Sequence, residues 1–414
     1  MTNKEDILEL IVPDQKEKDD AFKKYQEISA YISEKYNRET ILVGSVAKDT
    51  FLKGDKDLDI FMFFSANESR RFMESEAISI GKDVFDHYGV PHQIEYAEHP
   101  YVSGKIGEYA IEIVPCYKVD SGSDMKSSVD RTPFHLTYVK NNLDPHHHDD
   151  VRLLKKFLKS QKLYGAETKI NGFSGYLCEL LIIHYGTFMS LMERGSMWVR
   201  GKVIELNATK KNFSDPLVFV DPVDPNRNVA SPVSLDTLSR FVLACNRFLD
   251  GHDYTMFLGP EKGYAPVAGG RLLVIAIDVD VLEEIYFAQC RRFLNAIERA
   301  CGKEGFTIYK SGVFSKGIVL DFELDSLPKM QKHKGPKIGN FENMKNFFEK
   351  NDIVFAEKGQ LFALKERRFN DVNDIINDII DKEIGMGNHI KKANITILEG
   401  IKAISFLKYE VIYY

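Results

Sequence analysis

The sequence predicts an α+β protein with several domains, and three observations lead to this class. A chain of 414 residues exceeds the length at which a single hydrophobic core keeps growing. Short apolar runs alternate with helical patterns up to about residue 150, whereas an apolar period of 3.6 residues dominates 151–255. A stretch with several Gly and Pro residues, 259–270, then precedes a further strand, helix and strand pair. We therefore expect separate units of different architecture.

In the first unit, residues 16–36 have helical spacing, and "TILVGS" predicts a short strand that stops at Gly44. A helix is expected to begin at Ser45, since Ser is a favoured N-cap. "DLDIFMFF" and "EYAIEIVPCYKV" (108–119) predict two more strands. Polar stretches at 120–130 and 141–150 flank "RTPFHLTYV" and close the unit near residue 150.

The rest of the chain is expected to be helical first and mixed afterwards. Three amphipathic or apolar patterns predict helices: "VRLLKKFLKSQKLYG", "GYLCELLIIHYGTFMSLM" and "SLDTLSRFVLACNRFLD". Beyond the linker candidate come a strand at 272–278, a helix at about 281–302 and two strands near 307–325, an order that indicates a small α/β sandwich. A basic stretch, 329–350, and a final strand-helix pattern follow.

Charge, cysteine content and hydropathy limit the function classes. The chain carries 55 Lys and Arg against 61 Asp and Glu, so a polyanionic partner must be bound by local basic patches. The five cysteines are odd in number and form no C-x-x-C pair, which favours a reduced, cytoplasmic setting over a disulfide or zinc framework. Charged residues fill the first twenty positions, and Asp278 and Asp280 interrupt the longest apolar run, so we expect no membrane segment.

Two carboxylates stand at the start of the second strand. Strand side chains alternate between faces, so Asp57 and Asp59 point the same way while Leu58 points into the core. Two such charges repel unless a cation lies between them. Glu112, on a neighbouring strand, would complete a set of oxygen ligands that suits Mg²⁺, and two-ion sites of this kind drive in-line displacement at phosphorus.

Each of these features has a plainer explanation when taken alone. A D-x-D pair is common at solvated strand ends, and a Ser before a helix is usually only a cap. Their order favours the metal site: a strand, Gly44-Ser45, a helix start and then D-x-D on the next strand. A helix N-terminus also suits a triphosphate. This combination resembles the nucleotidyltransferase superfamily, which includes polymerase beta and the poly(A) polymerases.

Further segments resemble the archaeal class I CCA-adding enzymes: "RTPFH", "VRLLKKFLK", "YGAE", "GFSGYLCELLI" and "DPVDPNRNVA". The resemblance implies a polymerase-beta-like nucleotidyltransferase head at 1–150 and a helical neck at 151–258. It also implies a ferredoxin-like body at 259–325 and 382–414, and a tRNA-binding tail at 326–381. The implied activity adds C, C and A to the 3′ end of tRNA from CTP and ATP without a nucleic-acid template, using two Mg²⁺ ions.

The resemblance also implies roles for single residues. It assigns the metal-binding and catalytic triad to Asp57, Asp59 and Glu112, and nucleotide contacts to Ser45, Lys48, His135, Lys155, Tyr164 and Arg227, the last as reader of the incoming base. The chain departs from the family pattern at two positions. Glu112 stands where we expect Asp, and Lys48 stands where relatives carry Arg. Both changes keep the charge, although ligand reach and bidentate geometry can differ.

Several alternatives stay open from sequence. Without the motifs, Lys155 would belong to a solvated helix face, Tyr164 would close that helix, and His135 would be a core histidine. We expect "DPHHHDD" to be a loop before a helix and not a metal site. The basic stretch 329–350 and "LKERRF" are candidates for gripping tRNA, with solvated surfaces as the alternative. A homodimer is left open, and so are another untemplated RNA polymerase and an inactive RNA-binding relative.

Overall fold

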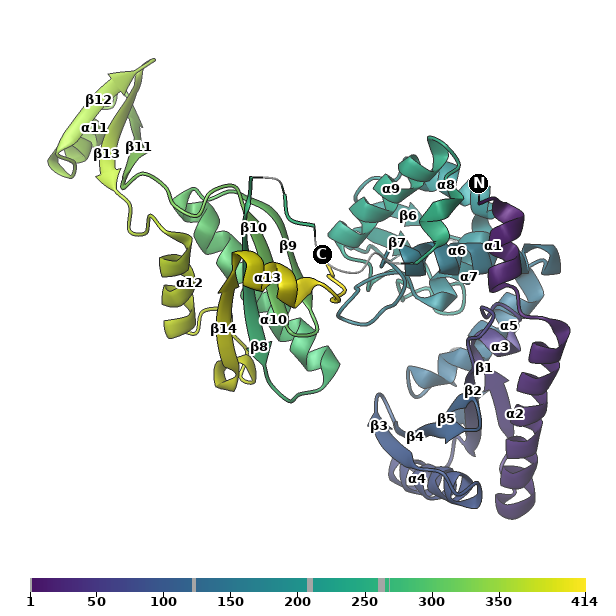
Figure 1. Cartoon of the computed structure of the whole chain (residues 1–414). Helices are drawn as coiled ribbons and strands as arrows, with labels where there is room; N and C mark the ends of the chain where they lie inside the picture. Colours follow the sequence, from purple (N-terminus) through teal and green to yellow (C-terminus); the bar gives the residue numbers. More distant parts are fainter. Residues whose placement is uncertain (1, 121–123, 207–210, 260–264, 268) are drawn as a thin grey trace. The chain divides into compact units, whose positions relative to one another are not determined.

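The computed structural model describes residues 2–120, 124–206, 211–259, 265–267 and 269–414. The chain divides into two compact units, Met1–Pro260 and Glu261–Tyr414. The ribbon in Figure 1 shows a mixture of helices and sheets in each unit, so the mixed α+β class and the presence of more than one domain are confirmed. Within the predicted linker, 259–270, residues 260–264 and 268 lie outside the described part of the chain.

The first unit is built on a five-stranded sheet of order β1-β2-β5-β4-β3. Its strands are β1 (Thr40–Val43), β2 (Asp57–Ser65), β3 (His92–Tyr96), β4 (Pro100–Ile106) and β5 (Tyr109–Lys118). Strands β2 and β5 run parallel, and the other neighbours are antiparallel. Because a parallel pair needs a long crossover, β2 and β5 come from segments far apart in sequence and meet at the centre of the sheet.

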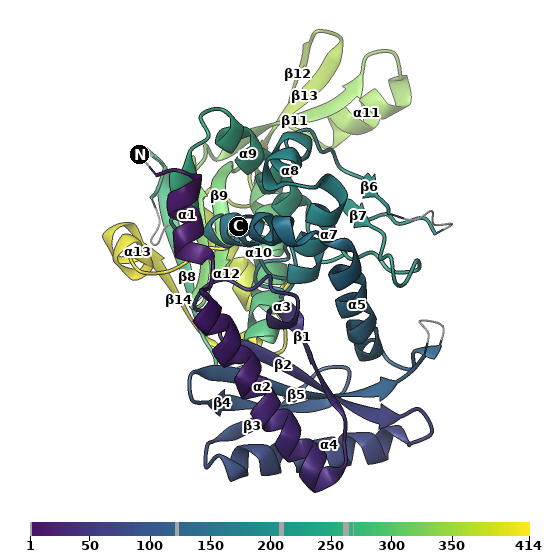
Figure 2. The ribbon, with the colours of Figure 1, turned by 90° about the vertical axis from the view of Figure 1, so that its right-hand side faces the viewer.

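The two faces of this sheet are covered differently (Figure 2). Helices α2 (Gln15–Tyr36) and α4 (Arg70–His87) pack on one face, where Leu58, Ile60 and Met62 of β2 are buried. Side chains of the opposite parity, such as Phe61 and Val114, form a smaller cluster on the other face with α5 (Thr132–Asn142). The alternation of strand side chains therefore places Asp57 and Asp59 on the α5 face.

The rest of the first unit is mainly helical. It comprises α6 (His148–Ser160), α7 (Gly175–Tyr185), α8 (Phe188–Gly195), α9 (Leu235–Leu249) and a small parallel pair, β6 (Lys202–Ile204) with β7 (Leu217–Phe219); α1 (Lys4–Ile11) packs against α6, and the one-turn α3 spans Gly44–Ala47. Short 3₁₀ turns occur at Val129–Arg131, Pro145–His147 and Tyr254–Phe257. The "DPHHHDD" segment thus forms such a turn and leads into α6.

Helices α7 and α8 come from one apolar stretch that bends sharply. Gly186 has a φ of 85°, in the left-handed region that Gly adopts at low cost, and it ends α7. Thr187 then caps α8, so the helix axes differ by 93°. Of the helices that the structure describes, none is by itself long and apolar enough to cross a membrane; this pair passes the same test only when taken together.

The second unit contains a four-stranded antiparallel sheet of order β14-β8-β10-β9. Its strands are β8 (Arg271–Asp278), β9 (Ile308–Phe314), β10 (Gly317–Phe322) and β14 (Asn394–Glu399). Helices α10 (Glu283–Glu304) and α12 (Val372–Asp381) share one core with this sheet, and α13 (Gly400–Leu407) contributes to a second, smaller core. A short turn, Ile390–Lys392, precedes β14.

A three-stranded sheet is inserted between β10 and α12. It has the order β11-β13-β12, with β11 (Met330–Lys337), β12 (Ile353–Glu357), β13 (Gln360–Glu366) and helix α11 (Phe341–Glu349). The chain enters and leaves this part at one place, because the Arg367 amide donates to the Lys329 carbonyl at 2.7 Å. Helix α12, included by the sequence in the same tail, instead packs on α10 in the core of the four-stranded sheet.

Candidate functional site

Three carboxylates lie on the α5 face of the first sheet. Leu58 is 1% exposed and points into the core, so Asp57 and Asp59 point to the opposite face as expected. Asp59 pairs directly with Glu112 across the parallel strands β2 and β5. Residues paired in this way project from the same face of a sheet, so strand pairing brings together acids that are 53 positions apart.

Burial and neighbouring carboxylates raise the pKa values of all three acids. Burial, followed by the charges of Asp59 and Asp57, raises the pKa of Glu112 to about 7. Burial and the neighbouring Asp57 raise the pKa of Asp59, and burial together with Asp55 raises that of Asp57. A divalent cation would relieve this repulsion, and carboxylate oxygens are the donors that Mg²⁺ prefers. Among the described residues, however, no three His, Cys, Asp or Glu side chains are gathered closely enough to hold a metal ion.

Gly44 makes room for one of these carboxylates. Its φ is 72°, and a Cβ atom at this position would lie 1.9 Å from the Asp59 Oδ2 atom. The expected N-cap at Ser45 is wrong: Val43 is the N-cap of α3, no side chain caps the helix, and Ser45 is its second residue. Because α3 has only four residues, its dipole offers little to a triphosphate. The helix begins at Gly44, which has a left-handed φ, one residue before the expected start at Ser45.

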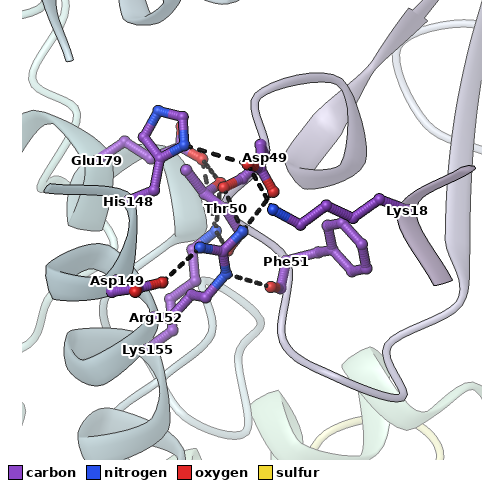
Figure 3. Close-up of polar contacts among 9 residues, drawn as sticks. All are labelled: Lys18, Asp49, Thr50, Phe51, His148, Asp149, Arg152, Lys155 and Glu179. Atoms are coloured by element: carbon purple, nitrogen blue, oxygen red, sulfur yellow. Dashed lines mark hydrogen bonds and ion pairs between the residues drawn. The ribbon is translucent and has the colours of Figure 1, made fainter. Parts of the chain in front are cut away.

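Lys48 and Lys155 meet at a buried carboxylate, Glu179. The Lys48 Nζ atom lies 2.5 Å from Glu179 Oε2, and the Lys155 Nζ atom lies 3.4 Å from Oε1. Thr50 joins them: its hydroxyl donates to Glu179 at 2.6 Å, and its hydroxyl and carbonyl oxygens both accept from Lys155 at 3.0 Å. Figure 3 shows the part of this cluster formed by Thr50 of the loop after α3, Lys155 of α6 and Glu179 of α7. Lys155 is 2% exposed and so does not belong to a solvated face.

A second buried cation fixes the same loop. Arg152, also 2% exposed, donates to the carbonyl oxygens of Phe51 at 3.0 Å and Asp49 at 2.6 Å and pairs with the Asp49 carboxylate (Figure 3). Lys18 and His148 contact the same carboxylate, and these partners hold the pKa of Asp49 well below its usual range in spite of its burial. Helix α6 thus holds the loop between α3 and β2 through two neighbouring turns.

Tyr164 lies beside Lys155, after the end of α6. A Cβ atom on Gly175 would lie 3.0 Å from the Tyr164 hydroxyl and 3.9 Å from the Lys155 Nζ atom. Gly175 and Glu179 are four residues apart on α7, so they lie on the same side of that helix. The absence of a side chain at Gly175 therefore leaves space next to both predicted nucleotide contacts.

His135 and Arg227 meet at another buried acid, Asp221. The Asp221 Oδ2 atom lies 2.9 Å from His135 Nε2 and 2.8 Å from a guanidinium nitrogen of Arg227. Tyr176 donates to Asp221 at 3.3 Å and stacks on His135, with ring centroids 4.0 Å apart. Lys48 lies 5.8 Å from the centre of the Tyr176 ring. The lysine cluster and the Asp221 cluster are therefore neighbours.

The sequence interpretation missed Glu179 and Asp221. Glu179 lies in the apolar run "CELLII", where a single charge is unexpected unless it has a partner, and this was the available signal. Asp221 begins "DPVDPN", which is typical of a turn and gave no such signal. Of the nine predicted site residues, the structure gathers Lys48 and Lys155 on Glu179, with Tyr164 close by at Gly175, and His135 and Arg227 on Asp221. Asp57, Asp59 and Glu112 share one face of the central strands β2 and β5, and Ser45 lies on α3.

Three family models match successive parts of the chain. Residues 25–135 match the nucleotidyltransferase domain, residues 149–258 match the second domain of tRNA nucleotidyltransferase, and residues 271–400 match the C-terminal domain of the CCA-adding enzyme. The five-stranded sheet with its acids lies within the first range. The fold and the site therefore define a nucleotidyltransferase.

Curated relatives narrow this class further. The CCA-adding enzyme of Methanocaldococcus jannaschii is 36% identical over 87% of this chain and 86% of its own length. The corresponding enzyme of Methanothermobacter thermautotrophicus is 34% identical over 94% of this chain and 91% of its own. The chain belongs to the CCA-adding enzyme family of tRNA nucleotidyltransferases.

Solved structures give a more distant likeness. The Cid1 RNA terminal uridylyl transferase aligns with 62% of this chain and 96% of its own at 14% identity and a TM-score of 0.49. A cytoplasmic RNA terminal U-transferase aligns with 64% of this chain and 98% of its own at 13% identity and a TM-score of 0.48.

Proposed function

We propose that this chain completes the CCA 3′ end of tRNA from CTP and ATP without a nucleic-acid template, and releases pyrophosphate at each addition. The observation that carries the proposal is the match to CCA-adding enzymes over nearly the whole chain, combined with an intact set of three acids on one sheet face. A catalytically dead relative would not be expected to keep Asp57, Asp59 and Glu112 together with buried lysines beside them.

The acids Asp57, Asp59 and Glu112 would hold two Mg²⁺ ions. The donor set suits that ion, and a cation bound among the acids would offset the carboxylate repulsion that helps to raise the pKa of Glu112. When bound, the ions supply acidification of the RNA 3′-hydroxyl and stabilisation of charge on the triphosphate. The protein's own part is to hold the carboxylates on one face of the central strands of a rigid sheet, and Gly44 contributes by admitting Asp59 close to the backbone.

Lys48, Lys155, Tyr164 and Ser45 would bind the triphosphate. Lys48 and Lys155 supply positive charge at the two carboxylate oxygens of Glu179, Lys48 from the loop between α3 and β2 (the head loop) and Lys155 from α6. Positioned ammonium groups stabilise the charge that develops on phosphate oxygens during transfer. The Tyr164 hydroxyl lies at the Gly175 gap, next to Lys155.

Arg227 and His135 would read the base. Asp221 accepts from both side chains and is fully buried, so it fixes their direction; the guanidinium of Arg227 still has donors free for a base edge. The pKa of His135 is lowered by burial although Asp221 opposes this, so the ring favours its neutral form. Because the one N–H of a neutral imidazole is donated to Asp221 from Nε2, the Nδ1 atom is left as an acceptor, which suits the amino group of a base and not a phosphate.

The finer domain plan is part of the same proposal: head 1–150, neck 151–258, body 259–325 with 372–414, and tail 326–371, because α12 packs on α10 in the core of the body. The strand order β14-β8-β10-β9 with helices α10 and α12 supports a ferredoxin-like body. The basic strand β11 supports a tail that contacts tRNA. Five buried free thiols support a cytoplasmic location, and a homodimer remains open.

One assay tests the function. A tRNA trimmed of its CCA is incubated with Mg²⁺ and each nucleoside triphosphate, alone and in combination, and the products are read at single-nucleotide resolution. We expect C, C and A to be added in order and synthesis to stop. A long homopolymeric tail would instead identify a poly(A) polymerase or a similar enzyme, and the absence of product with intact tRNA binding would identify an inactive relative.

A further inference from the structure

The contacts of Glu179 point to a role that goes beyond stability. This carboxylate is 1% exposed and faces two cationic side chains and a hydroxyl that come from separate elements. A buried charge is tolerated only when it is well paired, and here one anion serves two ammonium groups. Both of those ammonium groups are proposed contacts of the incoming triphosphate.

We propose that Glu179 is a positioning residue that keeps Lys48 and Lys155 protonated and correctly placed for the incoming triphosphate. This inference rests on the proposed function of the two lysines. Lys48 reaches Glu179 from the head loop and Lys155 reaches it from α6, so one carboxylate sets the separation of two groups that must act on the same ligand.

The electrostatic surroundings of Lys155 support a protonation role. Burial lowers the pKa of its ammonium group, Glu179 offsets part of that, and Lys48 adds to the lowering. The groups that face Lys155 are Glu179 and Cys178 on α7, Lys48 and Thr50 on the head loop, and Tyr164 beyond α6. Among these groups, Glu179 is the only carboxylate. Burial opposes its ionisation, yet Lys48 and Lys155 hold its pKa below the usual value.

Neutralising Glu179 should therefore make nucleotide binding depend on pH. In a Glu179→Gln variant the shape is kept, but Lys155 is left buried beside another cation and loses its proton at lower pH. Binding of a triphosphate must then return that proton, and affinity should fall by up to about tenfold for each pH unit above the shifted pKa. The wild-type protein should show a nearly constant affinity over the same interval.

The experiment measures equilibrium binding of ATP with Mg²⁺ by titration calorimetry between pH 7.5 and 9.0, for the full chain. Glu193→Gln is the matched control, because Glu193 is an exposed acid on α8, the helix that follows α7. Thermal unfolding at each pH shows whether the variants are folded. Glu179→Asp keeps the charge and should restore the flat pH profile even if its affinity is lower at every pH.

Two results of the binding titrations would overturn the inference: a Glu179→Gln profile parallel to that of the wild type, or a loss of affinity that is uniform across the pH range and follows a loss of folding. If the wild-type chain binds ATP but adds no CCA, the proposed function fails while the role of Glu179 can still be judged from the binding profiles. If both wild type and variant add CCA with the same KM for ATP at pH 9.0, the role of Glu179 fails while the function stands.

Discussion

Gly44 and Asp59 are fitted to one another: the carboxylate oxygen of Asp59 occupies the space that a side chain on Gly44 would need, 1.9 Å from the position of its Cβ atom. Gly44 also has a φ of 72°, where other residues are strained. Adding even a methyl group at Gly44 would therefore displace the Asp59 carboxylate.

Gly44→Ala should lower nucleotide addition by about 10²-fold, since displacing a catalytic group by about 1 Å has an effect of this size. Gly54→Ala is the matched control. Its φ is 84° and it carries a similar backbone strain, about 1–2 kcal/mol, but no atom lies within 4 Å of the added Cβ. Single-turnover addition and thermal unfolding are measured for both. Equal losses of activity would show that strain alone, and not the contact with Asp59, is responsible.

Asp59→Asn should reduce addition by roughly 10²–10³-fold and leave tRNA binding almost unchanged, because we assign this acid to the metal ions and not to RNA. Rates come from single-turnover assays and binding from filter or gel-shift titrations. Asp20→Asn, which changes an exposed acid on α2, should alter neither the rate of addition nor tRNA binding. Activity of the Asp59 variant within a few fold of wild type would contradict its place in the triad.

Glu112 is expected to make the free energy of unfolding fall as pH rises. Its pKa is raised from 4.5 to about 7 in the folded protein, so the protonated form is favoured by folding. The contribution of Glu112 to the free energy of unfolding is therefore fully present below pH 4.5 and is lost as pH rises toward 7. Without Mg²⁺, Glu112→Gln should therefore be more stable than wild type at pH 8, by about 1 kcal/mol after allowance for solvent screening, and similar to it at pH 5.

Thermal unfolding at the two pH values checks this, and Glu108→Gln gives the opposite sign, because Lys56 lowers the pKa of Glu108. Added Mg²⁺ should stabilise wild type more than Glu112→Gln, since a ligand stabilises the state that binds it. A difference between wild type and Glu112→Gln that is the same at pH 5 and pH 8 would show that the raised pKa is not the cause.

Arg227→Ala should change the choice of nucleotide more than the rate of transfer. Lys48 and Lys155 remain near the triphosphate, whereas few groups read the base, and a lost charge-assisted hydrogen bond is worth roughly 1.5–3 kcal/mol, or about 10–150-fold in selectivity. The test is single-turnover addition of all four nucleotides to tRNAs that end before the first C, the second C and the A. The same slowing for every nucleotide would assign Arg227 to phosphate or RNA.

Arg247→Ala, on the exposed side of α9, provides the guanidinium control. It should leave both the rates and their ranking unchanged. Asp221→Asn is expected to resemble Arg227→Ala in its loss of selectivity, because Asp221 fixes the direction of both Arg227 and His135.

Removal of residues 330–366 should weaken binding of full-length tRNA far more than binding of an acceptor-stem minihelix. The chain ends left behind are already adjacent, because the Arg367 amide donates to the Lys329 carbonyl, so a Gly-Gly link can close the gap. Helix α12 must be kept, since Val372 and Ile376 belong to the core. Equal losses for both RNAs, with the rest of the chain folded, would show that this part does not reach the distant regions of tRNA.

The sequence predicted the central strand pair from two apolar runs, and the alternation of strand side chains predicted that Asp57 and Asp59 share the face opposite to Leu58. It failed at Ser45, where the usual preference of Ser for N-cap positions lost to the left-handed turn at Gly44. It placed α12 in the tail because a chain position does not show which core an amphipathic helix joins; packing against α10 decides this.

The two buried anions escaped notice for a related reason. Glu179 contacts Lys48 across 131 positions and His135 contacts Asp221 across 86, and no local period records such pairs. The local sequence also does not show that Lys155 is buried. Its helix carries other lysines, and only the position of Glu179 distinguishes the buried lysine from the solvated ones. Local patterns predict which face of an element is apolar, whereas the partners of a buried charge depend on tertiary contacts.

The parallel pairing of Asp59 with Glu112 has a consequence for natural variation in length. Inserting or deleting a single residue within β5 ahead of Glu112 would carry every later side chain of that strand to the other face and turn the acid toward α4. The strand pairing can tolerate single substitutions, but it cannot tolerate a change in the length of a strand. Among relatives that remain active, we therefore expect gaps in alignments to be absent from 109–112 and to gather in the connections outside the sheet.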